Sequence, residues 1–128
     1  MSTVLSIIII LAGFVVVLQV YIWLSGIFRK GKIVQDLGGE LGERIKTGQR
    51  LLLYFYSPSC GACRTMTPVI EKMKNEKKNV MKINVQDDYS VARKLGVMGT
   101  PATVVIENSR INHFVLGARS ENFLRKLI

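Results

Sequence analysis

Two cysteines, Cys60 and Cys63, are the only ones in the chain and stand three residues apart. They follow an apolar, aromatic run over 51–56 that predicts a buried strand, and helical composition continues to about Lys78. Free N–H groups and the dipole at a helix N-terminus favour an anion. We therefore expect Cys60, with Arg64 nearby, to have a pKa below the free value of about 8.5. Cys63, nearly one turn later, would reach a mixed disulfide at Cys60 and close an internal disulfide.

Half of a metal site and a pair of structural thiols are the alternatives for two cysteines at this spacing. Tetrahedral zinc needs four ligands, whereas this chain has two cysteines and one histidine, His113, far from them in sequence. We therefore predict no metal and no cofactor within one chain. Two chains that pool their cysteines remain an open alternative.

The segment over 53–64, Leu-Tyr-Phe-Tyr-Ser-Pro-Ser-Cys-Gly-Ala-Cys-Arg, resembles the active-site segment of the thioredoxin family. Pro68 matches the proline that bends the active-site helix of that family. The run over 82–85 looks like its next strand, and the run over 96–103 resembles the segment that carries its cis-proline. These motifs agree in order and spacing, and the resemblance covers roughly residues 33 to 128.

The resemblance implies a role for each matching residue. Cys60 would be the attacking thiol and Cys63 the resolving thiol, and the two would form the redox disulfide. Pro101 would be cis, and the backbone of Thr100 before it would pair with the substrate chain. Supporting positions are Gly61, Ala62 and Pro68.

Two departures from the family pattern bear on the chemistry. Thioredoxins carry a buried Asp where this chain has Tyr54, and a tyrosine with a pKa near 10 is a poor base. Lys82, which matches the lysine beside that Asp, is expected to lose its partner, so that protons would pass through water or Lys82. We expect turnover that is slower and more dependent on pH than in a general thioredoxin. The pair Gly61-Ala62 and the neighbouring Ser59, in place of Gly-Pro and Trp, imply a different redox potential.

The first 28 residues carry no charged side chain, and the 18 basic and 9 acidic residues all follow them. An apolar run over 4–28 would be about 37 Å long as a helix, against a hydrocarbon core of about 30 Å. A cleaved signal peptide would have a basic start and a shorter apolar core. We therefore predict a short tail over 1–3, a retained transmembrane anchor over 4–28 and a basic linker over 29–32.

The charges beside the anchor predict its orientation. Arg29, Lys30 and Lys32 follow the span, and only the chain's own amino group precedes it. The positive-inside rule then places the N-terminus outside and the C-terminal domain in the cytoplasm. An extracytoplasmic domain is the alternative.

The remainder, 33–128, is predicted to be one α/β domain with a thioredoxin-like fold. Alternating strands and helices imply parallel pairing with right-handed crossovers, and a turn near Asn108 adds an antiparallel hairpin. The expected core is a mixed sheet of about four strands flanked by helices. We expect helices over 33–50, 60–78, 90–95 and 120–128, and strands over 51–56, 79–85, 102–106 and 111–116. Ser120 is expected to cap the last helix, with Phe123 among its inward-facing residues.

Two classes of function fit this sequence. The first is a membrane-anchored thiol–disulfide oxidoreductase, acting as a reductant on protein disulfides and recharged by a thioredoxin-reductase-like or membrane electron donor. The second is a non-catalytic docking or assembly subunit of a membrane protein complex. The net charge of +9 suits an acidic partner or anionic lipid headgroups. No motif indicates nucleic-acid binding, and we predict none.

Overall fold

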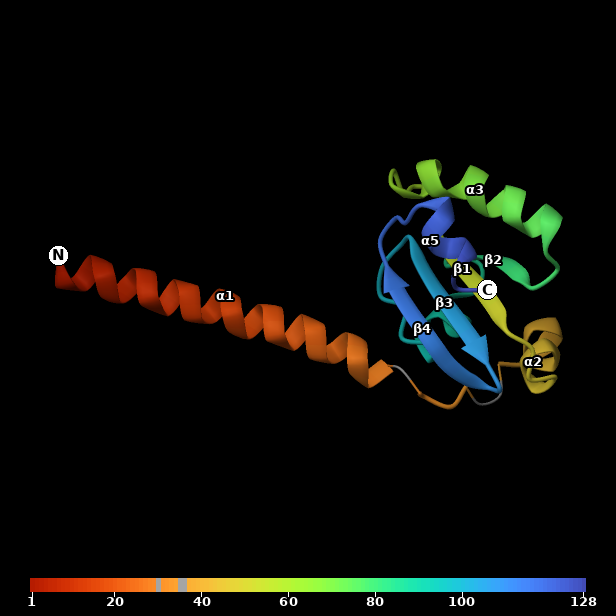
Figure 1. The fold of residues 1–128 in the computed structure, drawn as a ribbon, viewed down its shortest axis with the longest axis horizontal. Helices are drawn as coiled ribbons and strands as arrows, with labels where there is room; N and C mark the ends of the chain where they lie inside the picture. The colour runs from red at the N-terminus through yellow and green to blue at the C-terminus, as the bar shows by residue number, and fades with distance from the viewer. Residues whose placement is uncertain (30, 35–36) are drawn as a thin grey trace.

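The structure is a computed structural model that describes residues 1–29, 31–34 and 37–128, with the backbone alone over 25–29. It consists of a long N-terminal helix and an α/β domain (Figure 1). The helix, α1 (Ser2–Arg29), projects away from the domain, and its described side chains are exposed throughout. Its portion Ser2–Leu24 is long and apolar enough to cross a bilayer.

A four-stranded mixed sheet forms the centre of the domain. Its strands are β1 (Leu51–Tyr56), β2 (Val80–Asn84), β3 (Ala102–Glu107) and β4 (Arg110–Leu116), in the order β2-β1-β3-β4. β1 pairs in parallel with β2 and antiparallel with β3, and β3 and β4 form an antiparallel hairpin. The predicted mixed sheet of four strands is confirmed.

The strand β1 is buried on both faces because helices cover each side of the sheet. Its odd-numbered residues pack with α2 (Gly39–Lys46) and α4 (Tyr89–Lys94). Its even-numbered residues pack with α3 (Cys63–Glu76) and α5 (Glu121–Arg125). This alternation follows from the period of two in a strand. The residues from Leu51 through Phe55 are at most 1% exposed, so the end of β1 is held firmly on both sides.

The helix predicted over 33–50 is wrong in its first half. Ile33 forms an antiparallel bridge with Arg110, and α2 begins only at Gly39. Gly38 and Gly39 have φ angles of 66° and 60°, a left-handed conformation that favours glycine and interrupts a right-handed helix. The chain ahead of them is therefore free to extend along the edge strand β4.

The last helix is shorter than predicted, but its cap is confirmed. The hydroxyl of Ser120 accepts a hydrogen bond from the Phe123 N–H at 3.3 Å. Leu124 and Leu127 are buried. The expectation that Phe123 faces inward is wrong: this side chain is exposed, and the Arg119 guanidinium lies 5.6 Å from its ring centroid. A single turn or so of helix has a narrow buried face, which Leu124 already fills.

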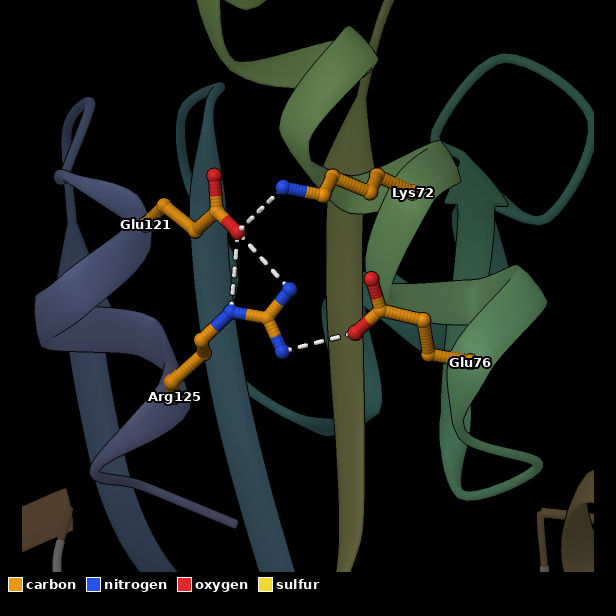
Figure 2. A network of polar contacts seen from close by, with 4 residues as sticks. All are labelled: Lys72, Glu76, Glu121 and Arg125. Carbon is orange, nitrogen blue, oxygen red and sulfur yellow. Dashed lines mark hydrogen bonds and ion pairs between the residues drawn. The ribbon is translucent and has the colours of Figure 1, made fainter.

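A network of charged side chains joins α3 to α5 on the surface (Figure 2). Arg125 contacts Glu76 at 2.8 Å and Glu121 at 2.7 Å, and Lys72 contacts Glu121 at 3.1 Å. The guanidinium of Arg125 is the main reason that the pKa values of Glu76 and Glu121 lie below their ordinary value of 4.5. These side chains are partly exposed, so solvent and salt screen the interaction.

We predict that Arg125→Gln lowers the resistance of the domain to urea at neutral pH, modestly and less so at high salt. A carboxylate whose pKa is depressed by folding stabilises the fold above its unfolded pKa, and this contribution disappears as the pH falls through the folded pKa. The difference between variant and wild type should therefore shrink below about pH 4. Near-ultraviolet circular dichroism of the full chain in detergent micelles measures this, with Lys126→Gln as the control outside the network. A difference that persists undiminished in acid would contradict the prediction.

Candidate active site

The two cysteines lie where the buried strand β1 leads into α3. After Tyr56 the chain turns, with the Cys60 N–H donating to the Ser57 carbonyl at 3.1 Å, and α3 begins at Cys63. The sulfurs of Cys60 and Cys63 form a disulfide, with the two Cα atoms 5.3 Å apart. Cys60 therefore stands just ahead of the helix rather than within it.

The two sulfurs differ in their access to solvent. Cys63 is 2% exposed, whereas Cys60 is only partly buried. A protein disulfide can approach Cys60 but not Cys63 without rearrangement. The structure thus gives the pair the asymmetry that separates an attacking from a resolving thiol.

The start of α3 offers positive potential to Cys60. The backbone N–H of Cys63 points at the Cys60 sulfur, with 3.2 Å between nitrogen and sulfur. The first turn of α3 contains no acidic residue, and its N-cap, Ala62, has no side chain that satisfies the free N–H groups. Unpaired N–H groups at a helix N-terminus stabilise an adjacent anion. In the reduced form, these N–H groups therefore stabilise a thiolate at Cys60.

Tyr54 links the strand β1 to the helix α3 next to Cys63. It is fully buried, and its hydroxyl donates to the Cys63 carbonyl at 3.3 Å and lies 3.1 Å from the Thr67 hydroxyl. Burial raises its pKa above the ordinary value of 10, so the phenol is neutral at physiological pH. Its partners are a backbone carbonyl and a threonine, and a neutral phenol is not a general base. Tyr54 therefore has a structural role, because its hydrogen bonds hold α3 against β1.

Lys82 has an acidic partner, and our expectation that it would lose one is wrong. Its ammonium lies 2.6 Å from the Glu71 carboxylate on α3 and 4.7 Å from the centre of the Tyr56 ring. Tyr56 in turn stacks on Tyr54, with ring centroids 5.9 Å apart. The bond to Glu71 raises the Lys82 pKa and lowers the Glu71 pKa. Lys82 therefore stays protonated and does not serve as a base near neutral pH.

The proline loop meets the cysteine loop at the end of β1. The Thr100–Pro101 peptide bond is cis, as the resemblance implied, and the Pro101 carbonyl accepts a hydrogen bond from the Gly117 N–H. Ala102 pairs with Phe55, which places Pro101 beside the point where β1 ends. The fold thus brings Thr100 and Pro101 from sequence-distant positions to the same edge as the cysteines.

Two hollows flank the cysteine loop, and both border Ser57. One, of about 300 Å³, is lined by both cysteines together with Tyr56, Pro58, Arg64, Thr67 and Pro68. The other, of about 610 Å³, lies between α4 and the proline loop and includes Val85, Tyr89, Arg93, Met98 and Thr100. Gly61 and Ala62 form the exposed rim above Cys63. Pro68 is exposed within α3 and has no N–H to donate to the preceding turn.

Sequence reasoning missed Thr67 and Glu71, the partners of Tyr54 and Lys82. Thr67 stands four residues after Cys63, so it faces the same side of α3, and Glu71 follows one turn later. This spacing of four residues predicts that Thr67 and Glu71 lie along one face of α3. The ion pair between Glu71 and Lys82 on β2 depends on the order of the strands in the sheet, so no local sequence pattern predicts it.

We predict that Tyr54→Phe leaves the pH dependence of disulfide reduction unchanged. The wild-type rate should fall below about pH 7 because fewer thiols are ionised, and the variant should fall in parallel because a neutral phenol accepts no proton in this range. The variant should also lose about 1 kcal/mol of stability with the buried hydrogen bond. Stopped-flow reduction of a model disulfide and urea unfolding measure the two effects. A titration step that vanishes in the variant would show that Tyr54 takes part in proton transfer.

Comparisons with known proteins agree with this site. Residues 32–128 match the family model described as Thioredoxin. Thioredoxin of Bacillus subtilis (strain 168) is 30% identical over 81 residues, which cover 61% of this chain and 78% of that protein. NADPH-dependent thioredoxin reductase 3 of Arabidopsis thaliana is 28% identical over 81 residues, and the match covers 61% of this chain but only 15% of that protein.

Solved structures of thioredoxins have the same fold as this domain. A mutant thioredoxin from Halobacterium salinarum NRC-1 has a TM-score of 0.64 at 29% identity, over 78% of this chain and 88% of that one. Mitochondrial thioredoxin 3 from Saccharomyces cerevisiae, in its oxidized form, has a TM-score of 0.58 at 26% identity, over 68% of this chain and 83% of that one. With a family match over the whole α/β domain and the same fold in solved relatives, the chain belongs to the thioredoxin family.

Proposed function

We propose that this protein is a membrane-anchored thiol–disulfide oxidoreductase that reduces disulfides in protein substrates. The observation that carries the proposal is the sulfur pair itself: a reachable Cys60 at the start of a helix, joined to a shielded Cys63. The cis-proline loop at the same edge supports the assignment, with Thr100 as the residue whose backbone pairs with the substrate.

The reaction proceeds in two exchanges. The Cys60 thiolate attacks one sulfur of the substrate disulfide; that S–S bond breaks, and the departing substrate thiolate takes a proton from water. Cys63 then loses its proton and attacks the Cys60 sulfur of the mixed disulfide. The second substrate sulfur leaves as a thiolate, and the Cys60–Cys63 disulfide seen in the structure forms. Two electrons pass from the dithiol to the substrate.

Water is the acceptor that we propose for the Cys63 proton. Tyr54 is held neutral by burial, and Lys82 is held protonated by Glu71. Arg64 and Thr67 line the same hollow as Cys63, and we infer that water reaches the thiol through this hollow.

The anchor and its orientation are part of the proposal. The portion Ser2–Leu24 of α1 has the length and composition of a membrane span, and the basic residues Arg29, Lys30 and Lys32 follow that portion. We infer a cytoplasmic domain, where the prevailing redox poise keeps such dithiols reduced. One curated relative is named an NADPH-dependent thioredoxin reductase, which supports an electron donor of the reductase class.

We predict that Cys63→Ser accumulates mixed disulfides at Cys60. The first exchange is intact in this variant, but the thiol that releases the substrate is missing. Non-reducing electrophoresis of the membrane fraction should show adducts that dithiothreitol removes. The double variant Cys60→Ser, Cys63→Ser is the control and should show none.

The same experiment separates the two classes of function. A Cys63→Ser variant that captures nothing, while the wild-type chain purifies in a stoichiometric membrane complex, would contradict catalysis. That outcome would favour the docking or assembly subunit.

We predict that Cys60 in intact cells resists a membrane-impermeant maleimide and reacts once the membrane is permeabilised. The reagent cannot reach a cytoplasmic thiol across the bilayer. Ser2→Cys, on the other side of the proposed span, should already react in intact cells and serves as the control. Labelling of Cys60 from outside would overturn the cytoplasmic placement and would favour an oxidising role.

A further inference from the structure

The chain that leaves the membrane helix is bound to the domain rather than hanging free. The Gly31 N–H donates to the Ile111 carbonyl at 2.8 Å, and the Ile111 N–H donates to the Lys32 carbonyl at 3.0 Å. The Val34 N–H donates to the Ser109 carbonyl at 2.8 Å, and Val34 is buried. Residues 31–34, the docked tether, therefore extend the sheet at its β4 edge.

The direction of the docked tether decides which end of the domain faces the membrane. Its pairing with β4 is antiparallel. From Val34 to Gly31, against the chain direction, the docked tether therefore passes from Ser109, just before β4, to Ile111 within it. This is the direction of Leu116, the last residue of β4. Leu116 pairs with Ala102, directly after the cis-proline, so this is the end of the sheet that carries the cysteines. The C-terminal end of α1 comes near β4, and the helix departs on the same side as the start of α3 (Figure 1).

The lengths of the elements bring the cysteine end to the level of the bilayer surface. From Leu24, the end of the candidate span, to Arg29, the end of α1, is about 8 Å at the helical rise. From Ile111, opposite Gly31, to Leu116 is about 16 Å along β4. β4 is inclined to α1, so its projection on the membrane normal is shorter than its length (Figure 1). The cysteine end thus reaches the headgroup layer, which is several ångströms deep.

The surface at this end suits a membrane interface. Met98 is 85% exposed, Tyr89 68% and Leu116 56%, and all three stand out from the domain around the cysteine edge. Two arginines are exposed beside them: Arg93 borders the same hollow as Met98 and Tyr89, and Arg119 follows the end of β4. Apolar and aromatic side chains beside arginines match the boundary between headgroups and acyl chains.

We propose that the domain is held with its dithiol against the lipid surface, and that its substrates are disulfides of integral membrane proteins lying within the headgroup layer. This rests on the anchored oxidoreductase proposed above and narrows its substrate class. The chemistry is the same two-step exchange. What the tether adds is a restriction on which disulfides Cys60 can reach.

Fluorescence quenching in vesicles tests the orientation. The full chain carrying Cys60→Ala and Cys63→Ala is given one reporter cysteine, Met98→Cys at the dithiol end or Lys78→Cys at the opposite end. Each is labelled with bimane and reconstituted in phosphatidylcholine–phosphatidylglycerol vesicles that contain a nitroxide-headgroup lipid. We expect severalfold stronger quenching at position 98 than at position 78. Equal quenching, or stronger quenching at 78, would overturn the orientation.

A flexible insertion shows whether the docked tether sets the orientation. About twelve Gly and Ser residues placed between Lys30 and Gly31 free the domain from the anchor, and they should bring the quenching at the two positions together. Persistence of the difference would show that the tether does not set it. Vesicle flotation is read in parallel: loss of flotation would overturn the anchor itself, whereas flotation without position-dependent quenching would overturn only the orientation.

Substrate class is tested with the intact wild-type dithiol. One disulfide-containing loop is joined to a transmembrane helix either directly or through a long flexible spacer, and each form is co-reconstituted with the full chain. The directly joined loop should be reduced severalfold faster, and the tether insertion should abolish that preference. Equal rates for both substrates would overturn the substrate class while leaving the oxidoreductase assignment in place.

Discussion

The chemistry of this protein depends on the rigidity of one strand end. β1 is buried on both faces by two separate apolar clusters, so the point at which the chain leaves the sheet after Tyr56 cannot shift without disturbing either layer. Cys60 and Cys63 follow within a single turn, and the cis-proline loop meets them because β3 pairs beside β1. A reactive sulfur on a loop is positioned accurately only when its flanking elements are fixed. Here the flanking elements are a strand buried on both faces and the helix α3, which Tyr54 joins to that strand.

The residue that joins strand and helix is a tyrosine, and this gives the site a different character from one built on a buried acid. The hydroxyl of Tyr54 holds the carbonyl of Cys63 without bringing a charge into the core. Lys82, which has no acid at position 54, turns outward to Glu71 and lies over Tyr56. The charged pair sits at the margin of the sheet, where desolvation costs less than it would inside. The structural support of Cys63, which Tyr54 supplies, is thus separate from the ion pair of Lys82 and Glu71.

The edge strand β4 connects the cysteine end of the domain to the residues that follow α1. An exposed sheet edge presents unpaired backbone groups that invite other chains to bind. Residues 31–34 occupy the part of that edge near the β3–β4 turn, and their hydrogen bonds give the tether a definite direction. A segment whose sequence predicts the end of a basic linker and the start of a helix therefore covers part of a sheet edge.

Much of the fold and of the active site could be predicted from local sequence. The spacing of the cysteines, the apolar run before them and the alternation of strands and helices predict the sheet, the two-sided core and the position of the dithiol. The prediction of a helix over 33–50 was wrong in its first half, because periodicity alone does not show that Gly38 and Gly39 adopt left-handed backbone angles. Phe123 faces outward because the final helix is too short to bury a second large side chain.

By itself, the sequence determined the dithiol chemistry, the thioredoxin-like fold and the apolar segment ahead of it, since each arises from neighbours along the chain. Only the tertiary structure decided that Cys63 is shielded while Cys60 is reachable, that Glu71 is the partner of Lys82, and that the tether pairs antiparallel with β4. The physical reason is the same in each case. Burial, ion pairing across elements and strand pairing depend on residues far apart in sequence, and no local pattern specifies which of them will meet.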